Sequence, residues 1–153
     1  MTTTVRAESR CVLRTIDCWE KLRDLSLAKH YVPGVSEIEF VSPSRTGLGT
    51  SRIAHSSAGA LHETVIEWNE GEGFLLRLHR GDKPPRPMKD AHFRYAIEPD
   101  GVSTRIVLSM TYTFSVGPFG PLIERLARVP MQRNIDRIAL RLARYWETGS
   151  ADE

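Results

Sequence analysis

The feature that most constrains the fold is a run of six segments in which apolar residues alternate with polar ones. Between residues 35 and 114 these segments are VSEIEFVS, GTSRIAHS, LHETVIEWNE, GFLLRLHR, AHFRYAIE and STRIVLSMTYTF. A period of two residues is that of a strand with one buried face. Because the breaks between the segments are short and rich in Gly, Pro, Asp or Ser, we expect consecutive strands to pair as an antiparallel meander.

The regions on either side of this run add a strand and helices. Residues 5–13 alternate in the same way, and residues 15–32 show helical spacing that stops at Pro33-Gly34. After the breakers at residues 116–121, apolar residues recur at helical spacing for roughly seven turns. The apolar residues of this last stripe are Leu122, Ile123, Leu126, Ile135, Ile138, Leu142, Tyr145 and Trp146.

The sequence therefore predicts an α+β fold. A seven-stranded antiparallel sheet, with the N-terminal strand at its edge or closing pair, wraps around one long C-terminal helix. Two short helices follow the first strand, and the breakers near residue 117 reverse the chain so that the long helix lies across the buried face of the sheet. A chain of 153 residues suits one domain, which we place at residues 1–148, with residues 149–153 as a disordered tail.

Composition narrows the function classes. The net charge is +2 and 41% of residues are hydrophobic, without an apolar run long enough to span a membrane. The N-terminus lacks the features of a secretory signal, so we expect a cytoplasmic protein in which Cys11 and Cys18 are reduced thiols. The arginines of the C-terminal segment are interspersed with acidic residues, which favours a solvated helix face over a nucleic-acid site.

Several short pieces of sequence carry a family resemblance. In order along nearly the whole chain they are CWEKLRD, HYVPGV, GLGTSR, ETVIEWNEGEGF, IEPDGVSTRIV and VGPFGPLIERL. This series resembles the polyketide cyclase/dehydrase and lipid-transport family of the START-like (SRPBCC) superfamily. Trp19 and Asp24 match the first helix of that family, residues 33–35 its entry to the second strand, and residues 99–101 its last hairpin.

The resemblance implies a helix-grip fold with an elongated cavity between the sheet and the C-terminal helix, where apolar or aromatic molecules bind. The alternation of residues independently indicates a large apolar concave face. These side chains either contact a ligand or simply fill the core, since native interiors pack closely. The candidate ligand-binding residues are Ile53, Ile66, Trp68, Leu76, Tyr95, Met110, Tyr112, Phe114 and Ile138.

The hairpin RIAHSSAGALHET holds the best polar group. If its turn centres on Ala58-Gly59, His55 lies directly opposite His62. Two imidazoles at a cavity mouth could move protons near neutral pH, whereas at an exposed hairpin tip they would do nothing. In this register Arg52, Glu63 and the other charged residues of the sheet point outward, unless a bulge reverses the faces.

Two functions from different classes remain. The first is binding or carriage of a neutral or weakly polar hydrophobic molecule, aromatic, polyketide-like or lipid-like. The alternative is a polyketide cyclase, aromatase or dehydratase acting by proton transfer, with His55, His62, Tyr95 and Tyr112 as weak catalytic candidates. A weaker third possibility is partner binding through the arginine-rich helix face. No motif indicates a metal or a cofactor, and both a monomer and a homodimer are compatible with the sequence.

Overall fold

The computed structural model describes residues 2–85, 88–114 and 117–151. The first strand and the short helices after it are β1 (Thr2–Cys11), α1 (Thr15–Leu22), the 3-10 turn η1 (Leu25–Leu27) and α2 (Ala28–Tyr31). The strands that follow are β2 (Val35–Phe40), β3 (Ser51–Ser56), β4 (Gly59–Asn69), β5 (Gly73–His79), β6 (Met88–Asp100) and β7 (Ser103–Phe114). The chain ends in the long helix α3 (Gly120–Thr148).

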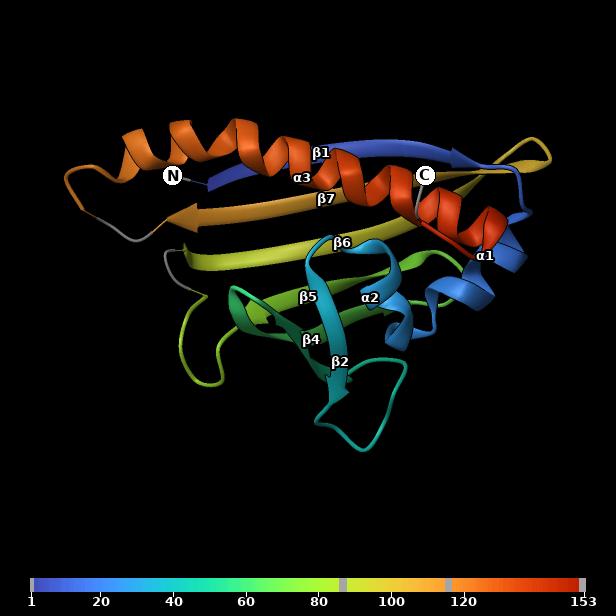
Figure 1. Ribbon diagram of the computed structural model, residues 1–153, viewed down its shortest axis with the longest axis horizontal. Coiled ribbons are helices and arrows are strands. Elements are labelled where there is room, and N and C mark those ends of the chain that lie inside the picture. The colour runs from blue at the N-terminus through green and yellow to red at the C-terminus, as the bar shows by residue number, and fades with distance from the viewer. Residues whose placement is uncertain (1, 86–87, 115–116, 152–153) are drawn as a thin grey trace.

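Within the described residues the strands form one seven-stranded antiparallel sheet, in the order β1-β7-β6-β5-β4-β3-β2. This order is a meander in which β1 returns to pair with β7 at one edge. Helix α3 packs mainly against β1 and β7, and it runs along them on one face of the sheet (Figure 1). The predicted helix-grip architecture, with the N-terminal strand at an edge, is confirmed.

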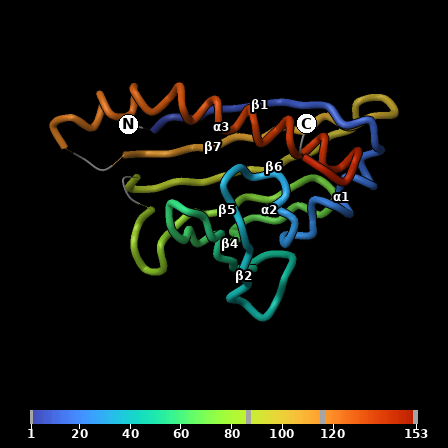
Figure 2. Tube along the Cα trace, in the orientation of Figure 1, coloured from blue at the N-terminus to red at the C-terminus, as the bar shows by residue number. Residues whose placement is uncertain are grey.

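The sheet is curved by irregularities in the pairing of its strands. Register shifts occur in the β2–β3, β4–β5 and β6–β7 pairs. Each such bulge bends the strand that carries it and increases the local twist. Gly73 adds a close approach, because a Cβ atom there would lie 2.0 Å from the carbonyl oxygen of Tyr95. The resulting concave face is visible in the Cα trace, where β2 and β3 swing away from the plane of β6 and β7 (Figure 2).

Most of the core packing of α3 is made by its second half. Ile135, Ile138, Leu142 and Trp146 are at most 3% exposed and lie three or four residues apart, so they share one face of the helix. In residues 120–134, all of which the structure describes, Glu124 alone is buried. The helix is therefore anchored to the sheet through its last four turns.

The predicted apolar stripe is wrong for the first half of α3. Leu122, Ile123 and Leu126 are 52%, 46% and 66% exposed. At 100° per residue, the face that carries Ile135 and Leu142 continues backward through Arg128 and Glu124, not through these three apolar residues. Ile123 and Leu126 consequently lie on the solvent side of the helix, and Leu122 lies at its exposed first turn.

The ends of the expected domain are only partly described. Gly149 ends α3 in the left-handed conformation, and Ala151 is 7% exposed. Residues 152–153 of the expected tail lie outside the described residues, as do residues 115–116 of the predicted strand end and residues 86–87 of the β5–β6 loop.

Both cysteines lie in the core where β1 meets α1. Cys11 and Cys18 are free, fully buried and in contact with each other. Burial raises the pKa of both thiols, that of Cys11 to about 12. They are therefore protonated at neutral pH and act as small apolar side chains of the core.

The assignment of the two faces of α3 is testable with a matched pair of leucines. Leu142→Ala removes a fully buried side chain and should lower the free energy of unfolding by about 2 to 5 kcal/mol. Leu126→Ala removes the same atoms from the exposed face and should change it by less than about 0.5 kcal/mol. Urea unfolding of both variants measures the difference, and equal losses would contradict the assignment.

Candidate ligand cavity

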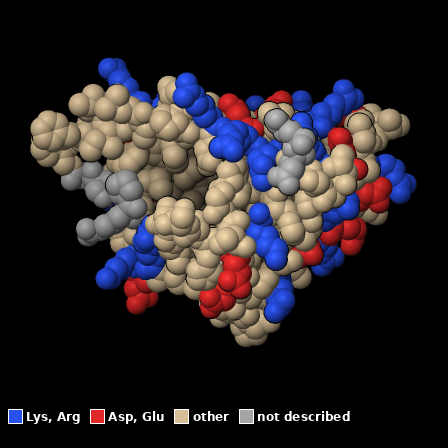
Figure 3. Space-filling view, in the orientation of Figure 1, with Lys and Arg blue, Asp and Glu red and all other residues tan. Residues whose placement is uncertain are grey.

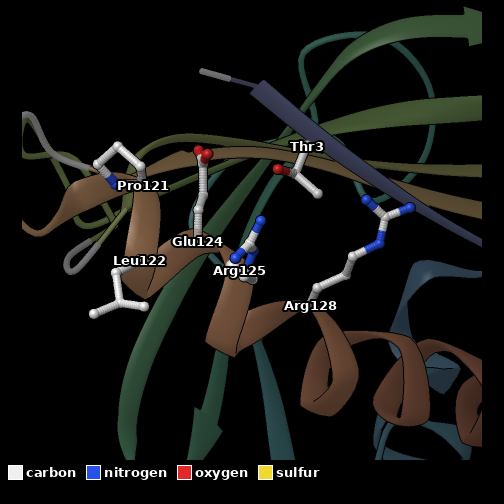
Figure 4. Close-up of a pocket in the computed structure, with 6 residues that line it drawn as sticks. All are labelled: Thr3, Pro121, Leu122, Glu124, Arg125 and Arg128. Atoms are coloured by element: carbon white, nitrogen blue, oxygen red, sulfur yellow. The ribbon is translucent and has the colours of Figure 1, made fainter.

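A cavity of about 540 Å³ lies between the first turns of α3 and the edge strand β1. Its lining residues are Thr3, Pro121, Leu122, Glu124, Arg125 and Arg128 (Figure 4). The molecular surface is also hollowed beside the first half of α3, and the atoms around this hollow belong mostly to uncharged residues (Figure 3). The cavity lies at the half of the helix that contributes little to the core.

The cavity follows from the side chains that the first half of α3 turns toward the sheet. On the side of α3 that faces the sheet, the second half carries Ile135 and Leu142. The first half carries Glu124 and Arg128 on the same side. Figure 4 shows Glu124, Arg125 and Arg128 extending from the helix toward the strands. Charged groups cannot be packed dry against an apolar sheet without a large loss of hydration energy. This half of the helix therefore leaves space instead of filling the core.

Tyr112 supplies a buried polar group on the sheet side of this space. It lies opposite Thr3 in the β1–β7 pair, so both side chains are on the same face of the sheet. The side chain is 1% exposed, and its hydroxyl group has no hydrogen-bond partner among the described residues. Burial raises the pKa of Tyr112, with Arg128 opposing and Glu124 adding to the shift. The phenol is therefore neutral at physiological pH and can donate a hydrogen bond.

Glu124 brings a carboxylate into the same region. It is 5% exposed, and its Oε1 atom accepts a hydrogen bond from the backbone N–H of Phe114 at 3.4 Å. We expected the acidic residues interspersed with the arginines of the C-terminal segment to lie on a solvated helix face, and this is wrong for Glu124. The signal that could have found Glu124 is its spacing of eleven residues, close to three helical turns, from Ile135.

A second polar group lies elsewhere on the concave face. Arg52 is 2% exposed, and its Nε atom lies 2.8 Å from Glu63 Oε1. Its Nη1 atom donates to the carbonyl oxygen of Leu25 at 2.5 Å, which ties β3 to the turn η1. Burial lowers the pKa of Arg52, but the charge of Glu63 more than offsets this, so the net shift is upward. The guanidinium is charged and paired inside the protein.

The rings of Tyr31 and Tyr95 pack beside this ion pair, edge to face with centroids 6.3 Å apart. Burial is the main reason that the pKa of Tyr31 rises to about 12 and that the pKa of Tyr95 rises well above its ordinary value. Arg52 opposes both shifts, but too weakly to reverse them. Both phenols are thus neutral members of a packed polar cluster.

The prediction that Arg52 and Glu63 point outward is wrong for one structural reason, a bulge in β4. The hairpin turn is Ser57-Ala58 instead of Ala58-Gly59, because Ser56 pairs with Gly59, but this shift of two positions leaves the faces unchanged. A bulge between Val65 and Glu67, by contrast, reverses the faces within β4. Trp68 points inward as expected, but on the other side of the bulge the inward residues are the odd-numbered ones, which include Glu63 and Val65.

This reversal places both histidine candidates on the outer face. His55 is opposite Ala60 and its Nε2 atom lies 2.9 Å from Glu39 Oε1, whereas His62 is opposite Ile53 and its ring contacts His79. The predicted cross-strand pair of His55 and His62 is not formed. Ile53 and the 42% exposed Ile66 lie on the same outer face, away from the cavity.

The remaining ligand candidates on the concave face are mostly packed. Leu76, Tyr95, Met110 and Ile138 are buried core residues, and Trp68 stacks on Phe74 and contacts Trp19 edge to face. Phe114 is half-buried and meets Tyr112 edge to face, with ring centroids 5.6 Å apart. Among the sequence candidates, Tyr112 and Phe114 are therefore those nearest to the cavity.

The ion pair can be tested by a double-mutant cycle. Arg52→Met or Glu63→Leu alone leaves one buried charge without its partner and should lower the free energy of unfolding by about 3 to 5 kcal/mol. The double variant removes both charges and should lose much less than the sum of the two single losses. Urea unfolding measures all three variants, and simple additivity would show that the two side chains do not interact.

The comparison with known families identifies the chain. Residues 14–147 match the family described as polyketide cyclase / dehydrase and lipid transport, and the chain belongs to this family. Among curated proteins, none matches the sequence.

Solved structures share the fold at low sequence identity. A protein of Thermus thermophilus has 23% identity and a TM-score of 0.70, with 97% of this chain and 99% of that chain covered. Truncated norcoclaurine synthase from Thalictrum flavum has 19% identity and a TM-score of 0.67, with coverage of 91% and 92%. Ara h 8.0201 has 15% identity and a TM-score of 0.65, with coverage of 93% and 98%. At these identities the likeness concerns the fold alone.

Membrane-spanning helices and metal-binding clusters are both lacking among the described residues. None of their helices combines the length and the apolar character needed to cross a membrane. In the same part of the chain, no three His, Cys, Asp or Glu side chains gather in a way that could hold a metal ion.

Proposed function

We propose that the chain binds a hydrophobic small molecule in the cavity between the first half of α3 and the sheet. The observation that carries this proposal is the cavity itself, about 540 Å³ at the half of the helix that contributes little to the core. Sites for small organic molecules commonly have volumes of about 300 to 1,000 Å³. Membership of a family whose description includes lipid transport supports the same class of ligand.

The surroundings of the cavity suit a ligand that is apolar over most of its length. The half-buried ring of Phe114 and the buried ring of Tyr112 offer apolar area on the sheet side. The unpaired hydroxyl group of Tyr112 offers one fixed hydrogen bond, which is the usual way in which an apolar site orients its ligand. Affinity then comes mainly from buried apolar area, at roughly 25 cal/mol per Å² before the cost of association.

Two neighbouring threonines of β1 provide a matched test of this proposal. Thr3 lines the cavity, whereas Thr4 points to the outer face and contacts Thr111 there. Thr3→Phe should fill part of the cavity and weaken binding of a neutral fluorescent naphthylamine by about tenfold or more. Thr4→Phe adds the same bulk on the opposite face and should leave the affinity within about twofold.

Fluorescence titration of the wild type and both variants gives the answer, with circular dichroism to confirm folding. If the wild type does not bind the probe, the proposed function is wrong. If the two variants bind it equally well, binding occurs somewhere other than in this cavity.

A second candidate function is catalysis of proton transfer on a bound polyketide-like carbonyl compound, as in a cyclase, aromatase or dehydratase. Its supporting observation is that the carboxylate of Glu124, which lines the cavity, is near enough to the hydroxyl group of Tyr112 to affect its pKa. Glu124 would take a proton from a carbon next to a carbonyl group, and Tyr112 would donate a hydrogen bond to the oxygen that becomes negative. These two residues replace the imidazoles of His55 and His62 in that role. A synthase among the structures that share the fold supports the possibility of catalysis.

Deuterium exchange tests this second candidate. The wild type should accelerate uptake of solvent deuterium by a small 1,3-diketone, and Glu124→Gln should reduce this acceleration by about a hundredfold. Asp136→Asn, on the exposed side of α3, is the matched control and should exchange like the wild type. If the wild type does not exceed the uncatalysed rate, the catalytic candidate is wrong while the binding proposal stands.

A further inference from the structure

Two arginines of the cavity wall lack a counter-ion. Arg125 and Arg128 line the cavity and extend from α3 toward the strands (Figure 4). Among residues 2–85, 88–114 and 117–151, no ion pair involves either of them. The one carboxylate that lines the cavity, Glu124, accepts a hydrogen bond from the backbone of Phe114 instead. Two guanidinium groups and one carboxylate leave the lining with an excess of one positive charge.

A third donor lies close to these two cations. The hydroxyl group of Tyr112 is buried and without a partner among the described residues, and Arg128 is near enough to affect its pKa. Tyr112 pairs with Thr3, which lines the cavity, so Tyr112 lies next to the cavity on the sheet side, and the guanidinium groups lie on the helix side. The first turn of α3 adds to the positive field, because it contains no acidic residue and is the positive end of a 29-residue helix.

We infer that the ligand of this cavity is an amphiphile with one compact anionic group, such as a carboxylate, which binds between Arg125, Arg128 and the hydroxyl group of Tyr112. The inference rests on the proposed function and specifies its ligand. The apolar body of the ligand would then lie along the concave face near Phe114. This replaces the expectation of a neutral ligand, which depended on charged residues pointing away from the cavity.

A neutral ligand and an anionic ligand differ in what they do to the interactions of the two guanidinium groups. A neutral apolar ligand would cover the cavity while leaving two guanidinium groups partly dehydrated and unpaired, which is unfavourable. An anionic group restores their interactions through charge-assisted hydrogen bonds, which are stronger than those between neutral groups. Glu124 opposes the anion, but its hydrogen bond to the N–H of Phe114 holds it at the end of β7, and the arginines outnumber it.

The test uses ligands that share one alkyl chain and differ only in the head group. Decanoate, decanol and decyltrimethylammonium each displace a neutral fluorescent probe from the wild type and from two double variants. Arg125→Gln with Arg128→Gln removes the cavity cations. Arg133→Gln with Arg137→Gln removes the same charge from the exposed side of the same helix and is the matched control.

We expect decanoate to bind at least about tenfold more tightly than decanol, and the cation most weakly. In the Arg125→Gln, Arg128→Gln variant, the affinity for decanoate should fall about tenfold while the affinity for decanol stays unchanged, so that the preference is lost. The control variant should keep the preference. Added salt should weaken binding of decanoate and not of decanol.

Three outcomes overturn the inference. Equal affinity for decanoate and decanol would refute the anionic ligand while leaving the hydrophobic-cavity function intact. An equal loss in both double variants would show that net charge, and not a site at Arg125 and Arg128, attracts the anion. Failure of all three ligands and of the probe to bind would refute the proposed function together with the inference.

Discussion

The attachment of α3 to the sheet by its second half is the constraint on which the other features depend. Ile135, Ile138, Leu142 and Trp146 are buried against the concave face, and each such side chain contributes about 1.5 to 3 kcal/mol by leaving water. This contact fixes the direction of the whole helix, so that the first half projects over β1 and β7. There Met131 still packs against the core, and Gln132 and Glu124 form hydrogen bonds with the two strands. The cavity is the volume that this projection encloses. It exists because hydrophobic packing ends at Met131 while the helix continues toward its N-terminus.

The polar groups at the concave face are of two kinds, those paired within the protein and those without an ion-pair partner. The ion pair of Arg52 and Glu63 is fully satisfied, since Arg52 also donates to the backbone of Leu25. A buried pair of this kind adds little net stability, but removal of one partner is costly, so it fixes the position of η1 against β3. Arg125 and Arg128, by contrast, are exposed on the wall of the cavity and form no ion pair among the described residues. Satisfied polar groups build the structure, whereas unsatisfied ones in a cavity indicate where a ligand supplies the missing partner.

Local sequence patterns predict the strands and their order, but not which face of β3 and β4 each side chain occupies. The strand β7 was predicted at its observed bounds, and the meander and the edge position of β1 were predicted because alternation and short turns are local signals. The faces of β3 and β4 were wrong because the bulge near Ile66 leaves no local signal, yet reverses every side chain beyond it. The polar lining at Glu124 and Arg128 was predictable in principle, since both fall on the helical face defined by Ile135. It was missed because the stripe was traced through the nearest apolar residues, Leu122 and Leu126.

The composition of the first half of α3 is itself an argument for a binding role. A helix selected only for stability would place apolar residues toward the sheet and charges toward water, yet here Glu124 and Arg128 face inward while Leu126 is 66% exposed. Pro130 lies between this half and the anchored half, and its ring removes the backbone hydrogen bond to residue 126. The helix is thus weakest at the point where packing against the sheet ends. Local rules are commonly broken where function requires it, and in α3 the exceptions occur together at the residues that line the cavity.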